Sequence, residues 1–276
     1  MKRRRAERLL EQLRVRPGRD VRVGGPEAGG DCGFRDRAWA ERELEREQRR
    51  LDELQARLYA GGEKALLVVL QAMDTGGKDG TIRRVLGPLN PQGVVVTAFK
   101  RPSEEELAHD YLWRVHRAAP ARGMIGVFNR SHYEDVLVVR VHGLCPKQEI
   151  ERRYGQINLF ERHLVENGTE LVKICLNITK REQKRRLQER LDDPAKRWKF
   201  DVGDLGERKL WDRYMQAYAL ALGRCSTAWA PWYLVPAERK WVRNLAVARI
   251  LRLTLEAMDL PRPRPRQSLK GVVIGD

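Results

Sequence analysis

Residues 66–84, LLVVLQAMDTGGKDGTIRR, have the types and spacing that suit phosphate binding. Gly76 and Gly77 let the backbone turn its N–H groups toward an anion, and a helix beginning near Asp79 adds the partial positive charge of its N-terminus. Lys78 follows the two glycines, where its ammonium group can reach the same phosphates. The order of buried strand, glycine-containing loop and helix therefore predicts a phosphate-binding P-loop.

The match to the usual P-loop pattern is incomplete, and the departures concern the metal. Ala72 stands where the first glycine is expected, and Asp79 stands where a metal-binding Ser or Thr should follow the lysine. Asp74 is the substitute that we expect to bind Mg²⁺, because a carboxylate is a hard ligand that this ion prefers. The alternative is a Gly-Gly turn that only ends a strand. The other predicted phosphate-binding residues of this stretch are Gly76, Gly77, Asp79, Gly80 and Thr81.

Polar side chains also follow two further apolar runs, each read as a strand. Lys100 and Arg101 come after residues 94–98, and Asn129 and Arg130 come after residues 124–128. The remaining expected strands are 66–70, 171–178 and 231–235, with expected helices at 37–59, 79–85, from 103, 146–167, 180–190 and 239–258. Strands that alternate with helices predict an α/β fold with a five-stranded parallel sheet, whose ligands bind at the carboxyl ends of the strands. We therefore expect these polar side chains to converge on one phosphate site.

The segment after residue 128 leaves two interpretations open for Glu134. Ser131-His132-Tyr133-Glu134 is a capping-box pattern, in which the glutamate closes a helix N-terminus. Glu134 can equally serve the site as a ligand, and the two roles are compatible. Asn129 offers an amide oxygen but no charge, whereas the planar guanidinium of Arg130 suits bidentate phosphate binding.

Residues 180–200 are strongly basic and follow the fourth expected strand. We interpret them as part of a lid, at about 180–203, that closes over the phosphate donor and excludes water. The alternative is a solvated charged face. The lid residues predicted to bind phosphate are Arg186, Arg190, Lys196 and Lys199.

The net charge of +16 over 276 residues indicates an anionic partner, although composition does not choose among nucleic acid, membrane and phosphate-rich substrate. Four widely spaced cysteines and the lack of a signal or membrane-spanning run predict a cytoplasmic protein without membrane contact. The domain organisation expected is a flexible basic arm without a fold of its own at 1–35, a kinase domain at 36–260, and a Pro/Arg-rich tail at 261–276.

The chain resembles the polyphosphate kinase 2 family, which transfers phosphoryl groups between polyphosphate and nucleotides. The resemblance covers about residues 35–260 and is carried by LQAMDTGGKDGTIRRV (70–85), FKRPSEEELAHDYLWRVH (99–116), FNRSHYEDVLVVRVHG (128–143), RLDDPAKRWKF (190–200) and APWYLVPAERKWVRNLAVARI (230–250). Many members have Asp-Arg-Ser at the third strand end, where this chain has Asn129-Arg130-Ser131 with Glu134 further on. That departure resembles the subgroup that phosphorylates both nucleoside mono- and diphosphates, and it leaves the part of Asn129 in metal binding open.

The resemblance implies a thymidylate-kinase-like three-layer sandwich, Mg²⁺, and inorganic polyphosphate as donor, with a homodimer or homotetramer as the assembly. It implies that Asp74 is a metal- and catalysis-associated acid, that Lys78 and Arg130 hold phosphates, and that 180–200 is the lid. Asp74, Lys78 and Arg130 are therefore the expected catalytic residues. We expect AMP or ADP as acceptor, with guanine nucleotides also considered. An ATP-dependent nucleotide or small-molecule kinase is the first alternative. A non-catalytic nucleic-acid-binding protein is the second, disfavoured because no RNA-binding signature accompanies Trp113 and Trp198.

Overall fold

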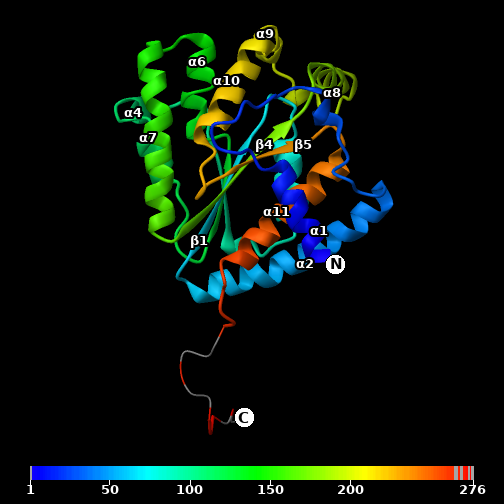
Figure 1. The fold of residues 1–276 in the computed structure, drawn as a ribbon, viewed down its shortest axis with the longest axis vertical. Coiled ribbons are helices and arrows are strands. Elements are labelled where there is room, and N and C mark those ends of the chain that lie inside the picture. Colours follow the sequence, from blue (N-terminus) through cyan, green and yellow to red (C-terminus); the bar gives the residue numbers. More distant parts are fainter. Residues whose placement is uncertain (1, 264–266, 268–269, 273, 275–276) are drawn as a thin grey trace.

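The computed structural model describes residues 2–263, 267, 270–272 and 274 and contains a five-stranded parallel sheet (Figure 1). The strands are β1 (Ala65–Gln71), β2 (Val94–Ala98), β3 (Ile125–Asn129), β4 (Thr169–Asn177) and β5 (Trp232–Pro236). Their order across the sheet is β2-β3-β1-β4-β5, and each neighbouring pair is parallel. All five predicted strands are confirmed to within two residues at each end.

The central strand β1 is buried along its whole length, whereas the edge strand β2 is not. Every residue from Ala65 to Gln71 is buried, as expected for a parallel strand covered on both faces. In β2, Val95 and Val96 are 49% and 47% exposed. The loop that follows β1 therefore starts from the most firmly held strand of the sheet.

Helices cover both faces of the sheet and give the three predicted layers (Figure 1). The helices α7 (Lys147–Glu166) and α10 (Trp211–Cys225) pack together, and α7 contacts β4. On the other side α11 (Lys240–Ala257) contacts β4 and β5 and is covered in turn by α2 (Arg37–Gly61). The shorter helices are α1 (Lys2–Leu13), α3 (Lys78–Thr81), α4 (Glu104–Leu107), α5 (Trp113–Arg117), α6 (Val138–His142), α8 (Lys180–Asp192) and α9 (Gly203–Lys209). A π-helical turn, Ile82–Leu86, continues α3, and 3-10 turns occupy Pro26–Gly29, Pro91–Gly93, His132–Asp135 and Arg197–Lys199.

The long helix α2 follows its predicted boundaries because both of its ends are capped. The side chain of Asp36 accepts a hydrogen bond of 2.8 Å from the Trp39 N–H, and Gly62 ends the helix in the left-handed region. Leu44, Leu51 and Leu58 are 2%, 0% and 1% exposed. This apolar stripe packs mainly on α11 of the same chain, so α2 forms part of the core.

The prediction of a flexible arm without a fold at residues 1–35 was wrong. The helix α1 contacts β5 and α11, and its Leu9 and Leu13 are 4% and 8% exposed. The Val15 N–H donates to the Trp232 carbonyl at 2.8 Å, and Arg14 forms an antiparallel bridge with Tyr233. Apolar residues four apart on a helix face one way, and the many arginines between them hid this short stripe from the composition argument.

The predicted tail at 261–276 lies mostly outside the described residues, apart from 261–263, 267, 270–272 and 274. Within the described part of the chain, no helix combines the length and the apolar character needed to span a bilayer.

Candidate functional site

The phosphate loop, residues 72–78, connects β1 to α3 and closes on itself through two hydrogen bonds. The Gly76 N–H donates to the Met73 carbonyl at 2.9 Å, and the Lys78 ammonium donates to the Ala72 carbonyl at 2.9 Å. Gly77 has a φ of 107°, a conformation that favours glycine. The predicted succession of strand, loop and helix is thus confirmed.

Close packing inside the loop explains why small residues occupy two of its positions. A Cβ added to Gly76 would lie 2.5 Å from the Cβ of Ala72 and 2.7 Å from the Met73 carbonyl oxygen. Gly76 is therefore required by its neighbours, and a side chain larger than that of Ala72 would press on the same space. Ala72 replaces the expected glycine at no cost to this packing.

An ion pair links the phosphate loop to the end of β3. The guanidinium Nη2 of Arg130 lies 2.9 Å from Oδ1 of Asp74, and the Arg130 N–H donates to the Leu70 carbonyl at 3.1 Å. Burial lowers the pKa of Lys78, while the nearby Asp74 carboxylate raises it. The structure thus brings Asp74, Lys78 and Arg130 together, as the sequence predicted.

Glu134 faces this cluster, and the capping-box interpretation of it is contradicted. The Ser131 hydroxyl accepts a hydrogen bond from the Tyr133 N–H, whereas the Glu134 N–H donates to the Ser131 carbonyl. Burial raises the pKa of Glu134, and the positive charges of Arg130 and Lys78 partly offset that rise. Glu134 therefore belongs to the electrostatic environment of the loop.

Asn129 and Asp79 are engaged with each other beside the loop. The Asn129 amide donates to Oδ1 of Asp79 at 2.8 Å, which joins the end of β3 to the first turn of α3. Thr81 is buried, and its hydroxyl donates to the Gly77 carbonyl at 2.9 Å. These contacts hold the start of α3 in place, and the amide oxygen of Asn129 stays available to a ligand.

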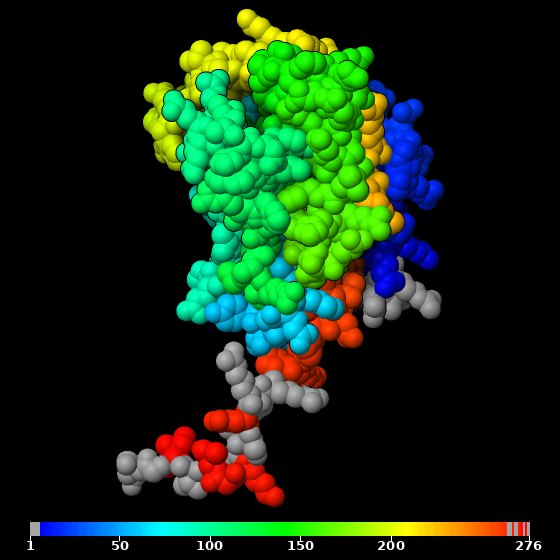
Figure 2. Space-filling model, turned by 90° about the vertical axis from the view of Figure 1, so that its left-hand side faces the viewer, coloured from blue at the N-terminus to red at the C-terminus, as the bar shows by residue number. Residues whose placement is uncertain are grey.

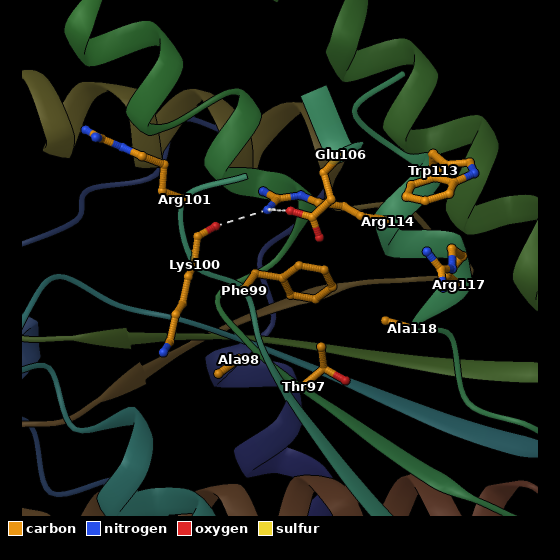
Figure 3. Close-up of a pocket in the computed structure, with 10 residues that line it drawn as sticks. All are labelled: Thr97, Ala98, Phe99, Lys100, Arg101, Glu106, Trp113, Arg114, Arg117 and Ala118. Carbon is orange, nitrogen blue, oxygen red and sulfur yellow. Dashed lines mark hydrogen bonds and ion pairs between the residues drawn. The ribbon is translucent and has the colours of Figure 1, made fainter. Parts of the chain in front are cut away.

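Lys100 and Arg101 line a separate pocket of about 380 Å³ beyond the end of β2 (Figure 3). The Arg114 guanidinium donates to the Lys100 carbonyl at 3.0 Å and lies 5.4 Å from the centre of the Phe99 ring. In Figure 3 the side chains of Lys100 and Arg101 extend away from Trp113. The pocket neighbours the phosphate loop through the pairing of Ala98 with Asn129, but neither cation contacts the Asp74–Arg130 pair.

The segment after β2 packs beside α7 on one face of the molecule, and residues 190–210 cover the top of that face (Figure 2). Tyr111 makes the contact, since its hydroxyl donates to the Gln156 side chain at 3.1 Å and its ring lies 4.7 Å from the Arg153 guanidinium. The segment that follows β2 is therefore anchored to a helix of the core.

Arg186 supports the phosphate loop through contacts within the protein, and its contact with phosphate stays a prediction. It is 6% exposed and donates to the carbonyls of Thr75 and Gly76 at 2.9 and 3.2 Å, and to those of Ala237 and Glu238 at 2.6 and 3.0 Å. Its Nε pairs with Glu182 at 2.7 Å. Because all three nitrogens already donate within the protein, Arg186 positions the loop.

The other predicted lid residues lie around the loop connecting α8 to α9. Arg190 donates to the Lys199 carbonyl at 3.1 Å and lies 3.5 Å from Asp204. Lys196 is exposed and pairs with Asp193 at 2.5 Å, and the Lys199 ammonium lies 4.9 Å from the Trp198 ring. Their contact with phosphate stays a prediction.

The sequence argument missed several residues that surround the site. Burial and the Asp74 carboxylate raise the pKa of Asp204 in α9 to about 6, and burial raises that of Tyr218 in α10, which lies near Glu134. Gln183 donates to the Asp74 carbonyl at 3.3 Å. An acid inside a basic segment and a tyrosine in an amphipathic helix carry no local signal of a site. Only the fold brings them near Asp74.

Among the described residues, no three or more His, Cys, Asp or Glu side chains are grouped so as to hold a metal ion. Asp74 still fits Mg²⁺, because Oδ1 accepts from Arg130 and Oδ2 has no hydrogen-bond partner within the described part of the chain. Mg²⁺ commonly binds through one or two carboxylates together with water and substrate phosphates. One free carboxylate oxygen beside a phosphate loop meets that requirement.

Comparison with known proteins agrees with this geometry. The family described as "Polyphosphate kinase 2 (PPK2)" matches residues 35–263. An AMP/ADP-polyphosphate phosphotransferase of Meiothermus ruber is 55% identical over 226 residues, which are 82% of this chain and 85% of the relative. An ADP-polyphosphate phosphotransferase of Rhodopseudomonas palustris is 42% identical over 265 residues, or 92% of each chain.

Solved structures also match. The crystal structure of polyphosphate kinase 2 from Arthrobacter aurescens superimposes with a TM-score of 0.91 at 47% identity, covering 95% of this chain and 94% of that one. A parallel sheet, a phosphate loop with its Asp–Arg pair, and close relatives over most of its length together place the chain in the polyphosphate kinase 2 family.

Proposed function

We propose that the protein transfers the terminal phosphoryl group of inorganic polyphosphate to AMP or ADP, giving ADP or ATP. The observation that carries this proposal is the Asp74–Arg130 ion pair beside Lys78 at the phosphate loop. It occurs in a chain that is 55% identical to a relative named AMP/ADP-polyphosphate phosphotransferase. The choice of AMP and ADP as acceptors follows that name, and a guanine nucleotide is included as a further acceptor because another relative is named a putative GDP-polyphosphate phosphotransferase.

The side chains around the loop suit in-line phosphoryl transfer. Such transfer passes through a loose transition state in which positioning and charge neutralisation matter most. The acceptor phosphate is already an anion at neutral pH, because its second pKa is about 6. No strong general base is needed. Loop N–H groups, Lys78 and Arg130 can hold the donor phosphates while Arg130 keeps its contact with Asp74.

Asp74 is the residue that would hold Mg²⁺, with Asn129 and Glu134 as neighbouring oxygen donors. When bound, the ion supplies further neutralisation of the phosphate charges. The family alone indicates a divalent metal, and the choice of Mg²⁺ is part of this proposal.

The assembly and location also stay proposals. We retain the homodimer or homotetramer predicted from the sequence, and the exposed valines of the edge strand β2 offer one surface for it. We retain a cytoplasmic location, which agrees with four free cysteine thiols.

The decisive experiment supplies either polyphosphate or ATP as donor to AMP and ADP in the presence of Mg²⁺. We expect nucleotide products with polyphosphate, measured by separation of AMP, ADP and ATP. Transfer from ATP alone would instead assign the chain to the ATP-dependent kinases.

A further inference from the structure

The chain between α1 and α2 crosses the molecule next to the predicted lid, and it precedes the residues 35–263 that match the family. In Figure 1 this part of the chain is drawn in blue and passes α10 on its way to α2. Its residues 22–30 are here called the strap. Ala28 of the strap is fully buried, and Gly24 has a φ of 74°, in the left-handed region that favours glycine. The strap is therefore a fixed part of the fold.

The two ends of the lid segment, residues 180–209, lie side by side. The segment begins with α8 directly after Thr179 and ends with α9, and α10 then starts at Trp211. The Arg208 guanidinium near the end of α9 donates to the Lys180 carbonyl at the start of α8 at 2.7 Å. A segment whose ends meet in this way can move against the core about one place.

The strap contacts the core at both ends of the lid segment, and Gly24 makes both contacts. The Gly24 N–H donates to Oδ1 of Asn177 at 2.8 Å, and Asn177 ends β4 just before the lid segment. Gly24 also packs on α10, since an added Cβ would lie 2.6 Å from Sδ of Met215 and 3.3 Å from the Trp211 ring. Gly24 therefore lies where the lid segment leaves the core and where it returns.

A second set of contacts joins the strap to the start of α8 through Glu238. The Glu238 N–H donates to the Ala28 carbonyl at 3.3 Å, and its Oε1 accepts from the hydroxyl of Thr179, the N-cap of α8, at 2.5 Å. The Glu238 carbonyl accepts from Arg186 at 3.0 Å, and Arg186 donates in turn to two carbonyls of the phosphate loop. The strap, the start of the lid segment and the phosphate loop thus form one hydrogen-bonded network.

A lid acts by closing over the reacting groups, which excludes water and completes their arrangement. Its closed position depends on where its two ends are anchored. We propose that the strap is a positioning element for this lid, an inference that rests on the proposed function. By holding the ends of β4 and α8 against α10, residues 22–30 set the place at which residues 180–209 close over the phosphate loop.

A lid that closes out of place should change the products. Water then reaches the terminal phosphorus of polyphosphate, which the acceptor oxygen should attack. A P–O bond to water forms, the bridging P–O bond breaks with its electrons on the shortened polyphosphate, a proton passes to solvent, and inorganic phosphate is released. The ratio of released phosphate to nucleotide product therefore reports the position of the lid, and it does not depend on the folded fraction of the enzyme.

The first test compares G24A with G18A. Both glycines have a positive φ, 74° and 69°, so both substitutions strain the backbone, but a Cβ at Gly18 meets no atom of the described residues within 4 Å. With polyphosphate and AMP, G24A should lower kcat about tenfold to 10²-fold and raise the ratio of phosphate to ADP at least about threefold, because a displacement of about 1 Å far from the chemistry is costly. G18A should keep the wild-type ratio. An equal rise in G18A, or an unchanged ratio in G24A, overturns the proposal.

The second test uses N177A, which removes the acceptor of the Gly24 N–H and leaves the strap sequence intact. Its control is N90A, which removes an amide oxygen that accepts from the Gln92 N–H elsewhere in the fold. N177A should raise the ratio of phosphate to ADP about twofold to tenfold, as expected when one hydrogen bond is lost, and N90A should not. If G24A does not fold, N177A decides, and an unchanged ratio in it overturns the proposal. If the wild-type enzyme forms neither ADP nor ATP from polyphosphate, the proposed function itself has failed.

Discussion

The Lys78 side chain is held over the phosphate loop by a hydrogen bond to the loop backbone. Its ammonium donates to the Ala72 carbonyl at 2.9 Å, so the side chain is already folded over the loop before a ligand arrives. When a phosphate binds, the Lys78 ammonium exchanges a neutral carbonyl acceptor for a charged phosphate oxygen, which gives a stronger hydrogen bond. Lys78 therefore contributes to binding with little loss of conformational freedom.

We expect K78M to lower kcat by about 10²- to 10³-fold, the range found when one preorganised charge-stabilising donor is removed. The free energy of unfolding should change by only ~0.5–1.5 kcal/mol, because one hydrogen bond to a carbonyl is lost. Product formation from polyphosphate and urea unfolding measure the two effects.

The matched control is K147M, which removes an exposed lysine at the start of α7 and should keep wild-type turnover. Turnover near the wild-type value in K78M would remove Lys78 from the mechanism.

Residue types and local order were enough to predict the cluster of Asp74, Lys78 and Arg130. Those residues directly follow neighbouring strands, and parallel strands bring their carboxyl ends to one edge. The loop contacts of Arg186 could not be assigned in this way, because they depend on which carbonyls a helix far along the chain happens to face.

At the scale of elements, a buried polar network fixes the turn that carries Arg130 and Glu134. The ammonium of Lys173 in β4 lies 2.5 Å from Oε2 of Glu161 in α7, and both side chains are fully buried. Oε1 of Glu161 accepts from the Tyr133 hydroxyl at 2.8 Å and lies 3.2 Å from Nε2 of His132. The turn after β3 is thereby tied to α7 and to β4.

We expect E161Q to destabilise the protein by about 3–5 kcal/mol, because it leaves the Lys173 charge buried without its partner. The double variant E161L/K173M should lose less, since neither charge remains. Urea unfolding at pH 7.5 compares the two. Equal losses would show that the pairing of these charges is unimportant.

Asp135 gives the turn a predicted pH dependence. Burial raises the pKa of Asp135 to about 6, against the lowering effect of Arg153 and Arg114. Because the folded-state pKa lies above the unfolded value, the folded protein takes up a proton first as the pH falls. The contribution of Asp135 to stability is therefore greatest below about pH 4 and is lost as the pH rises through 6.

We expect D135N to abolish this contribution. The difference in melting temperature between pH 5 and pH 7.5, measured by calorimetry, should shift in the variant by an amount that corresponds to about 1–3 kcal/mol. An unchanged difference would mean that Asp135 has an ordinary pKa in the folded protein.

The sequence predicted the elements that consist of continuous apolar runs, and it missed an element whose few apolar residues stand among charged ones. The strands were recognisable because each is a short apolar run of the length of a strand, and four of the five are largely buried in the parallel sheet. The helix α1 was missed because Leu9 and Leu13 stand among arginines and glutamates, and its packing depends on a β5 edge more than two hundred residues away.

At the scale of the whole molecule, the charge of +16 should act mainly on the longer anion. Salt screens interactions between exposed charges, and a polyanion that meets many cations releases more counterions than a small ligand. Between about 50 and 200 mM salt, we expect the KM for long-chain polyphosphate to rise at least about tenfold and the KM for AMP to rise less. Initial rates at fixed Mg²⁺ measure both. An equal rise in the two KM values would indicate that the charges outside the phosphate loop do not contribute to binding of the long anion.

The N-terminal pairing with β5 has a consequence for how copies of the chain can join. Residues 14–15 bond to Trp232 and Tyr233 along the outer side of β5, so that side of the sheet is blocked to an incoming strand. On the opposite side, β2 has no outer partner among the described residues. A protein with one open sheet edge can pair through that edge into a closed dimer but cannot extend into a filament by adding strands at both edges. Removing residues 1–15 would expose the β5 edge as well, so that copies could add at both edges and form an open filament.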